Sequence, residues 1–340
     1  MASDSTRPRQ ATIHDVAAAA GLSRGTVSRV INGEPYVSPA AKAAVESAII
    51  EVGYVPNTAA RNLKTRRSGA VALIVHEPHS LFLEDPNIGA IVLGTNSVLS
   101  DADYQLVTLV VDSNRDSERV ADYLRGGFVD GVIIISARAQ DPIGRAATGM
   151  KIPAVFVGHP PGLADIVYVG IDNVSAARTI TERLLATGRK RVGMIASALD
   201  RDSGQDRLAG FREALGERFD PDLVVEYPFY SYDSGLAGMR ELLARDPGID
   251  GVFAASDAIA AAAIDVLRAH GKAVPQEVGV VGFDDSAWAL RSQPQLSTVH
   301  QPAMTLGQEA ARLVLQQIAG DEIDTAGVIL QTEITWRESA

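Results

Sequence analysis

Two arginines near the start of the chain have the spacing of side chains that recognise base edges in DNA. Arg24 and Arg29 fall on the face of a predicted helix opposite Val27, Val30 and Ile31, which share one side by i, i+3 and i+4 spacing. An arginine can donate paired hydrogen bonds to the two acceptors of guanine in the major groove. The segment therefore has the chemistry of a recognition helix.

Three short helices are predicted to position these arginines. The first begins at Thr12, whose hydroxyl can cap free backbone donors, and ends at Gly21, where a left-handed residue is favoured. Ser23 can cap the second helix, and a third is expected between Ser38 and Gly53. This pattern is typical of a helix-turn-helix unit, although a three-helix bundle with solvated charges has the same spacing.

A basic arm, residues 56–68, follows the third helix. Its helical part is about two turns long, and isolated helices shorter than about 12 residues are marginal in water. We therefore expect the arm to fold on DNA, with phosphate contacts from Arg61, Lys64, Arg66 and Arg67. Leu63 is apolar in this polar setting. It either packs on the core or acts as a wedge between base steps in the minor groove.

The charge is divided between two parts of the chain. Residues 1–68 hold nine Lys/Arg and five Asp/Glu, a net charge of +4. The rest of the chain has a net charge of −15, which gives the total of −11. The basic charge is thus concentrated where DNA would bind, and the acidic remainder is repelled by phosphate.

Several classes of protein are disfavoured by what the sequence lacks. There is no cysteine, which excludes a disulfide framework and thiolate metal sites. No apolar run reaches the roughly 18 residues of a membrane span, and the polar residues 1–10, expected to be a disordered tail, do not form a secretory signal. We expect a cytoplasmic protein without a cofactor or metal. The nearest metal-like cluster, HEPH at His76–His79, has no clear third ligand.

After Gly69 the pattern changes to short apolar strands that alternate with helices. Two such series predict an α/β body of two periplasmic-binding-protein-like lobes, each a doubly wound parallel sheet. The expected domains are a helix-turn-helix headpiece at 11–55, a hinge at 56–68, a first lobe at 69–170 and 302–322, and a second lobe at 171–301 and 323–340.

Polar side chains converge at the carboxyl ends of the predicted strands, where open parallel sheets bind ligands. Carboxylates and arginine can hold neighbouring hydroxyls, and aromatic faces can cover a sugar ring or a base. Alternatives remain: Asp172 and Asp257 both precede helices and could be N-caps, Asp284 could serve a turn, and Trp288 could be core. Tyr230 could be ordinary packing, whereas Arg201 has no obvious structural need.

The segments ATIHDVAAAAGLSRGTVSRVIN, YVPNTAARNLK, GFDD and STVHQP resemble the lactose/galactose repressor (LacI/GalR) family of bacterial transcription factors over residues 11–337. The resemblance implies a homodimer or dimer-based tetramer on a palindromic operator, with Leu63 as the minor-groove wedge. It implies base contacts at Arg24, Gly25 and Arg29, although Gly25 has no side chain where relatives usually carry a polar one. No heptad helix follows Trp336, which favours a dimer formed through the effector domain.

The resemblance also implies an effector loop in SALDRDSGQDRLAGF, with Arg201 and Ser203 in the cleft and Arg207 supporting. Tyr230 matches a stacking aromatic and Asp284 an acidic anchor, whereas either Phe82 or Asn87–Ile88 could line the first lobe. The chain is expected to cross between lobes three times, with 302–318 forming a helix in the first lobe and 328–336 ending in the second.

These patterns predict a DNA-binding transcriptional regulator of the repressor type, whose operator affinity is controlled by a small effector bound between the lobes. A sugar is favoured; a purine or nucleoside corepressor and a free solute-binding protein are the alternatives. No motif of a hydrolase, a P-loop protein or a metalloprotease occurs, so we do not expect an enzyme.

The expected DNA contacts are Thr12, Ser23, Arg24, Gly25, Thr26, Ser28, Arg29, Asn32, Asn57, Ala60, Arg61, Leu63 and Lys64. The expected effector contacts are Phe82, Asn87, Asp172, Arg201, Ser203, Tyr230, Asp257, Asp284 and Trp288.

Overall fold

The computed structural model describes residues 11–32, 34–55, 67–138, 142–149, 152–163, 165–321, 323 and 327–340. The chain divides into two compact units, Met1–Arg67, here the headpiece, and Ser68–Ala340, here the body. Among the described residues, no helix is both long and apolar enough to span a bilayer.

In its described residues, the headpiece contains three helices around a small apolar core. They are α1 (Ile13–Ala20), α2 (Arg24–Ile31) and α3 (Pro39–Val52). Val16, Val27 and Val45, one from each helix, are fully buried at its centre. Because each helix has an apolar stripe at helical spacing, three short helices can bury those stripes against one another.

The ends of these helices are fixed by local side chains. Ser23 Oγ accepts the backbone N–H of Thr26 at 3.1 Å, and Ser38 Oγ accepts that of Ala41 at 3.2 Å. The Thr12 hydroxyl and backbone N–H both donate to Asp15 Oδ2, at 2.8 and 2.7 Å. Gly21 and Gly53 have φ of 64° and 62°, the left-handed conformation that ends a helix.

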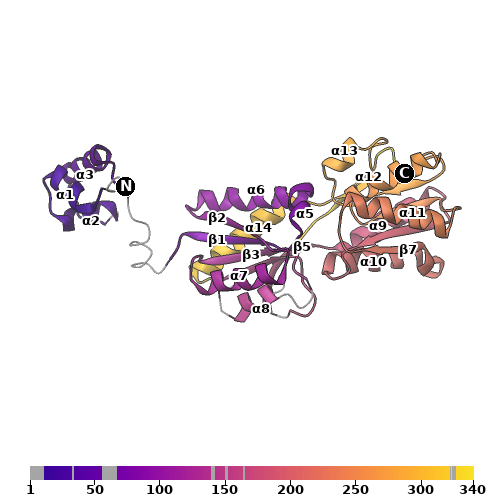
Figure 1. The fold of residues 1–340 in the computed structure, drawn as a ribbon, viewed down its shortest axis with the longest axis horizontal. Helices are drawn as coiled ribbons and strands as arrows, with labels where there is room; N and C mark the ends of the chain where they lie inside the picture. Colours follow the sequence, from indigo (N-terminus) through magenta and orange to yellow (C-terminus); the bar gives the residue numbers. More distant parts are fainter. Residues whose placement is uncertain are drawn as a thin grey trace, which may run out of the picture. The chain divides into compact units, whose positions relative to one another are not determined.

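The first lobe of the body is a six-stranded parallel sheet in the order β11-β5-β4-β3-β1-β2 (Figure 1). Its strands are β1 (Ala70–Val75), β2 (Gln105–Val110), β3 (Gly131–Ile135), β4 (Ala154–Val157), β5 (Val167–Ile171) and β11 (Val328–Leu330). Its helices are α5 (His79–Glu84), α6 (Pro86–Asp101), α7 (Asn114–Arg125), α8 (Pro142–Gly149) and α14 (Ala303–Ala319).

Alternate residues of β1 pack into two different cores, because successive strand side chains point to opposite faces of a sheet. Leu73 joins the core under α6 and α14, whereas Ile74 joins the core under α7 and α8. Helices α6 and α14 approach closely at two glycines. A Cβ at Gly94 would lie 2.0 Å from the backbone oxygen of Met304, and one at Gly307 would lie 2.2 Å from that of Ile91.

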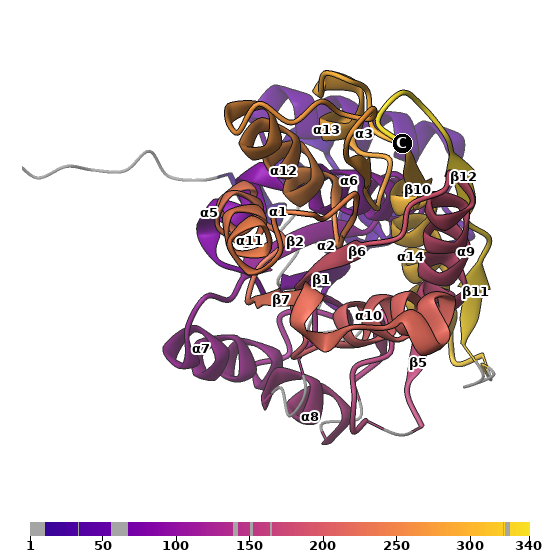
Figure 2. The same cartoon turned by 90° about the vertical axis from the view of Figure 1, so that its right-hand side faces the viewer.

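The second lobe is a four-stranded parallel sheet in the order β7-β6-β8-β9. Its strands are β6 (Val192–Ser197), β7 (Val224–Tyr227), β8 (Gly251–Ala254) and β9 (Gly279–Val281). Its helices are α9 (Asn173–Ala186), α10 (Asp202–Leu215), α11 (Tyr232–Arg245), α12 (Asp257–Ala269) and α13 (Ala287–Arg291), with short 3₁₀ turns η1 (Gly216–Arg218) and η2 (Pro221–Leu223). Helices α9 and α10 pack together, as do α11 and α12. Figure 2 shows α11 and α12 on one side of β6 and α9 and α10 on the other.

The chain passes between the lobes after β5, after β10 (Thr298–His300) and again before β12 (Glu333–Thr335). Strands β10 and β12 form an antiparallel pair. One expectation is corrected here, since β11 pairs with β5 in the first sheet although 323–340 was assigned to the second lobe. The outer edge of β5 would otherwise lack a strand partner, and the apolar residues of β11 supply one.

Candidate functional site

The face of α2 expected to meet DNA is exposed in the headpiece. Arg24, Gly25 and Arg29 are all exposed, and Arg29 Nε donates to the backbone oxygen of Gly25 at 3.2 Å. Asn32 Nδ2 donates to Ser28 Oγ at 3.2 Å one turn later. A Cβ at Gly25 would meet only Ser23 Oγ, at 3.7 Å, so this position has room for a larger residue.

Eight of the thirteen expected DNA contacts lie at the start of α1 or along α2 and its caps, with Asn32 as the C-terminal one. The other five belong to the arm and lie outside the described residues. They are Asn57, Ala60, Arg61, Leu63 and Lys64.

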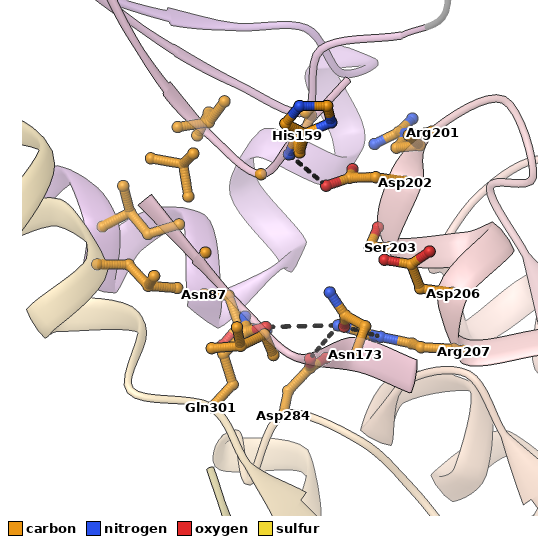
Figure 3. A pocket seen from close by; sticks show the side chains of 18 of the residues that line it. Asn87, His159, Asn173, Arg201, Asp202, Ser203, Asp206, Arg207, Asp284 and Gln301 are labelled. Atoms are coloured by element: carbon orange, nitrogen blue, oxygen red, sulfur yellow. Dashed lines mark hydrogen bonds and ion pairs between the residues drawn. The ribbon is translucent and has the colours of Figure 1, made fainter. Parts of the chain in front are cut away.

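A cavity of about 390 Å³ lies between the two lobes of the body. It is lined from the first lobe by the ends of β1, β3 and β4 and the start of α6, and from the second lobe by the start of α10 and the loops after β7 and β9. Figure 3 shows labelled polar side chains from one end of the cavity to the other, with Ser203 and Asp206 between the two ends, and carbon-only side chains along one side.

Arg207 organises one end of the cavity. Its guanidinium donates to Asn173 Oδ1 at 3.0 Å, Asp284 Oδ1 at 3.3 Å and Gln301 Oε1 at 3.4 Å (Figure 3). It also donates to the backbone oxygen of Ala255 at 2.6 Å and lies over the Phe283 ring, 3.6 Å from its centroid. A buried guanidinium with this many partners is held in one orientation.

Arg201 lies at the other end, with His159 and Asp202 (Figure 3). It forms a bidentate ion pair with Glu77, in which Nη1 donates to Oε1 and Nη2 lies 3.3 Å from Oε2. Burial alone would lower the pKa of Arg201, but the charge of Glu77 raises it above the ordinary arginine value. Arg201 is therefore permanently charged and bonded to the opposite lobe.

Hydroxyl and carboxyl groups lie between these two ends. Ser203 Oγ is 3.0 Å from Tyr230 Oη, and Asp206 follows Ser203 along the same helix. Burial raises the pKa of Asp206, and the charges of Asp202 and Asp172 raise it further. The cavity is thus rich in acceptors that can bind ligand hydroxyls.

Two carboxyls from opposite lobes face the same end of the cavity. Asp85, at the start of α6, accepts the Asn87 backbone N–H at 2.9 Å, and desolvation raises its pKa to about 6. Burial likewise raises the pKa of Asp284 well above its ordinary value, while the Arg207 charge acts in the opposite direction. Asp284 has a positive φ of 111°, and its backbone N–H donates to the Val299 oxygen in β10 at 2.8 Å.

Six of the nine expected effector residues line this cavity. They are Asn87, Asp172, Arg201, Ser203, Tyr230 and Asp284. Asp172 also caps α9 by accepting the Ser175 N–H at 2.9 Å, so the N-cap alternative is confirmed for that residue.

Three expected effector residues do not line it. Phe82, on α5, packs against the core of the first lobe. Asp257 is fully buried and accepts the Thr298 hydroxyl at 2.6 Å and the Ser286 N–H at 2.7 Å, so it holds the second lobe together. Ser256, not Asp257, caps α12. Trp288, on α13, stacks on Tyr232, with ring centroids 5.5 Å apart.

Several residues of the cavity were missed or undervalued in the sequence. Arg207 was expected only to support, and Asn173, Asp206 and Gln301 were not singled out. A signal existed for two of them, since Asp206 and Arg207 lie four residues after Asp202 and Ser203 and share their helix face. Asn173 and Gln301 become neighbours of Arg207 only through the fold.

The HEPH segment does not gather metal ligands in the described part of the chain. His79 Nδ1 lies 3.0 Å from Asp112 Oδ2, and both side chains are exposed. No group of three His, Cys, Asp or Glu residues suited to a metal ion occurs among the described residues.

A helix-turn-helix headpiece joined to a two-lobed body with an interlobe cavity defines a class of DNA-binding regulators. The family model for bacterial regulatory proteins of the lacI family matches residues 12–57, and that for a periplasmic binding protein-like domain matches 181–340. The HTH-type transcriptional regulator CelR of Thermobifida fusca is 45% identical over 338 residues, covering 98% of this chain and 99% of its own. The chain therefore belongs to the lacI family and is a DNA-binding transcriptional regulator.

Solved structures agree over nearly the whole chain. A transcriptional regulator CelR–cellobiose complex is 42% identical with a TM-score of 0.78, covering 98% of this chain and 100% of that one. The lac repressor dimer bound to operator and the anti-inducer ONPF is 25% identical with a TM-score of 0.86, covering 97% and 99%. The family and fold class predicted from the sequence are confirmed.

Proposed function

We propose that this regulator acts as a homodimeric repressor on a palindromic operator and that its cavity binds a neutral sugar of two rings. Occupation of the cavity by the sugar changes the relative position of the lobes, and with it the affinity for the operator. The observation that carries the proposal is that polar groups line the cavity from the Arg201 end to the Arg207 end (Figure 3).

Each end offers a different set of partners to a ring of hydroxyls. Asn87, Asp284 and Gln301 surround the Arg207 end, whereas Asp202 and His159 lie at the Arg201 end. Ile88, Ile91 and the other apolar lining residues can cover the carbon faces of the rings. A single small ring would leave one of these polar ends without a ligand partner.

The size and charge of the cavity fit the same class of ligand. Its volume of about 390 Å³ lies within the ~300–1,000 Å³ typical of small-molecule pockets. Asp85, Asp172, Asp202, Asp206 and Asp284 all line it, so a phosphate group would be repelled. The relative CelR has been solved in complex with cellobiose. We accordingly propose a β-linked glucose disaccharide as the effector.

The remaining parts of the proposal follow from the class of regulator. A chain that controls operator occupancy has to act in the cytoplasm, where the chromosome lies. We also propose that the cavity binds its sugar without chemical turnover. The arm residues Asn57, Ala60, Arg61, Leu63 and Lys64 remain proposed DNA contacts, with Leu63 as the wedge.

A thermal-shift titration tests the ligand class. Cellobiose should raise the unfolding temperature in proportion to the logarithm of its concentration, whereas glucose and guanosine should have much smaller effects. Asp284→Asn should remove the cellobiose shift, because the acceptor beside Arg207 loses its charge, yet leave operator binding intact. Asp200→Asn, at an exposed position beside the cavity, is the matched control and should keep the shift. A guanosine shift larger than that of cellobiose would contradict the sugar proposal.

A further inference from the structure

Three neighbouring residues of the second lobe reach across the cleft to three different strand ends of the first. Asp200, Arg201 and Asp202, here the interlobe strap, connect β6 to α10. Arg201 pairs with Glu77 after β1, and Asp200 Oδ2 lies 3.3 Å from Arg138 Nε after β3. The third contact comes from the backbone N–H of His159 after β4, which donates to Asp202 Oδ2 at 2.5 Å.

The central ion pair of the strap, Arg201–Glu77, is buried, whereas the flanking ion pair, Asp200–Arg138, is not. Arg201 is 3% exposed and Glu77 is 4% exposed, whereas the side chains of Arg138 and Asp200 are 30% and 45% exposed. An exposed ion pair contributes little because water screens it. Removing one partner of a buried pair leaves an uncompensated charge, which the molecule can avoid only by admitting water.

Between the lobes, water can be admitted without unfolding either one. Glu77 belongs to the first lobe and Arg201 to the second, so separation of the lobes would solvate both groups and leave each sheet intact. The pair is therefore formed in the closed arrangement and broken in an open one. A contact present in one of two states shifts the equilibrium between them by its own free energy.

We propose that Glu77 and Arg201 are positioning residues, whose buried bond holds the lobes closed over one end of the cavity. Arg201 was expected from the sequence to bind effector directly. Its guanidinium instead faces the Glu77 carboxylate through two donors. Because Arg201 and Asp202 of the strap also line the cavity, breaking this bond opens the route by which a ligand at that end leaves.

The closure can be measured without any ligand, because the chain contains no cysteine. Cysteines introduced at Glu118 on α7 and Glu217 in η1, both exposed, place one spin label on each lobe. Labelled full-length protein is mixed with an excess of unlabelled protein, so that distances within one chain dominate the dipolar signal. The parent protein should give a narrow distance distribution.

Glu77→Gln keeps the shape of the side chain and removes its charge. We expect it to broaden the distribution and shift it to longer distances, and we expect Arg201→Gln to do the same. The exchange Glu77→Arg with Arg201→Glu should restore a narrow distribution, which a merely structural role would not require. Arg138→Gln, the matched control on the partly exposed flank, removes the outer ion pair without touching Arg201 and should resemble the parent.

An unchanged distribution in folded Glu77→Gln would overturn the proposal. So would broadening by Arg138→Gln equal to that by Glu77→Gln, because it would show that the buried bond has no special role. Far-ultraviolet circular dichroism establishes that each lobe remains folded in every variant.

The consequence for the effector rests on the proposed function and is measured separately. Stopped-flow release of cellobiose should be about tenfold faster in Glu77→Gln than in the parent, if about 1.4 kcal/mol of closure is lost. If cellobiose does not bind the parent at all, the disaccharide proposal fails while the distance measurement still decides the role of the strap.

Discussion

Two buried arginines, Arg201 at the N-cap of α10 and Arg207 within it, bind partners in different lobes. Arg201 bonds to Glu77, which lies on the other lobe, whereas Arg207 bonds to Asn173, the Ala255 backbone and Asp284 of its own lobe. Both are almost fully buried, at 3% and 4% exposure. Burial and residue type are the same, so the difference lies in what each guanidinium connects.

The comparison separates a group that builds a lobe from a group that joins two lobes. Arg207 connects the start of α9, the end of β8 and the loop after β9 into one wall of the cavity, and its contact with Gln301 extends that wall to the segment after β10. Arg201 contributes nothing comparable to the inside of its own lobe. Loss of Arg207 should therefore destabilise folding, whereas loss of Arg201 should chiefly move the lobes apart.

The largest expected effect is on Arg207. Arg207→Met removes a buried charge that compensates Asp284 and leaves acceptors on Asn173 and Ala255 without a donor. We expect the free energy of unfolding to fall by about 3–5 kcal/mol in a urea titration. Arg201→Met should cost clearly less in the same titration, because its partner can become solvated when the lobes separate. Equal losses for the two variants would remove the distinction between the arginines.

A smaller effect is expected from pH at Asp85, the carboxyl opposite Arg207 across the cleft. Desolvation raises its pKa from 3.8 to about 6, so the folded protein favours the protonated form. Its contribution to stability is fully present below pH 3.8 and is lost as the pH rises through about 6.

Asp85→Asn retains a side chain that can cap α6 and removes this titration. The unfolding temperature of the variant relative to the parent should therefore increase between pH 4 and pH 7, the range set by the two pKa values. A difference that stays constant over that range would show that Asp85 is not desolvated in the closed body.

The smallest expected effect is at the outer contact of the strap. Arg138→Gln removes a partly exposed ion pair with Asp200, and the free energy of unfolding should change by about 0–1 kcal/mol. A salt titration should abolish even this difference, since screening acts strongly on exposed pairs. A larger, salt-independent loss would place the principal interlobe bond at Asp200 and not at Arg201.

The headpiece was largely predictable because its determinants are local. Ser23, Ser38, Gly21 and Gly53 act within a few residues of their own positions, and the structure places helix ends at each. Strand positions in the body were also predictable from the sequence, since a buried parallel strand is a short continuous apolar run. The pairing of β11 with β5 was not, because a strand's partner is chosen across the whole chain.

The cavity was predictable in outline and not in its contacts. The rule that ligands bind beyond the carboxyl ends of parallel strands located Asp172, Arg201, Tyr230 and Asp284 correctly. The same rule wrongly included Asp257, because a carboxylate at a strand end can equally turn inward to bind Thr298. Likewise, no sequence pattern could reveal that Arg201 faces Glu77, since 124 residues separate them.

The most direct test of the account measures operator affinity while the cavity is filled. Fluorescence anisotropy of a labelled palindromic operator should show a dissociation constant that changes at least about tenfold when cellobiose is added to the parent protein. Glucose should leave that constant unchanged, and Asp284→Asn should bind operator without responding to cellobiose. Operator affinity that is identical with and without cellobiose, in a protein that demonstrably binds the sugar, would contradict the proposed coupling of cavity to DNA.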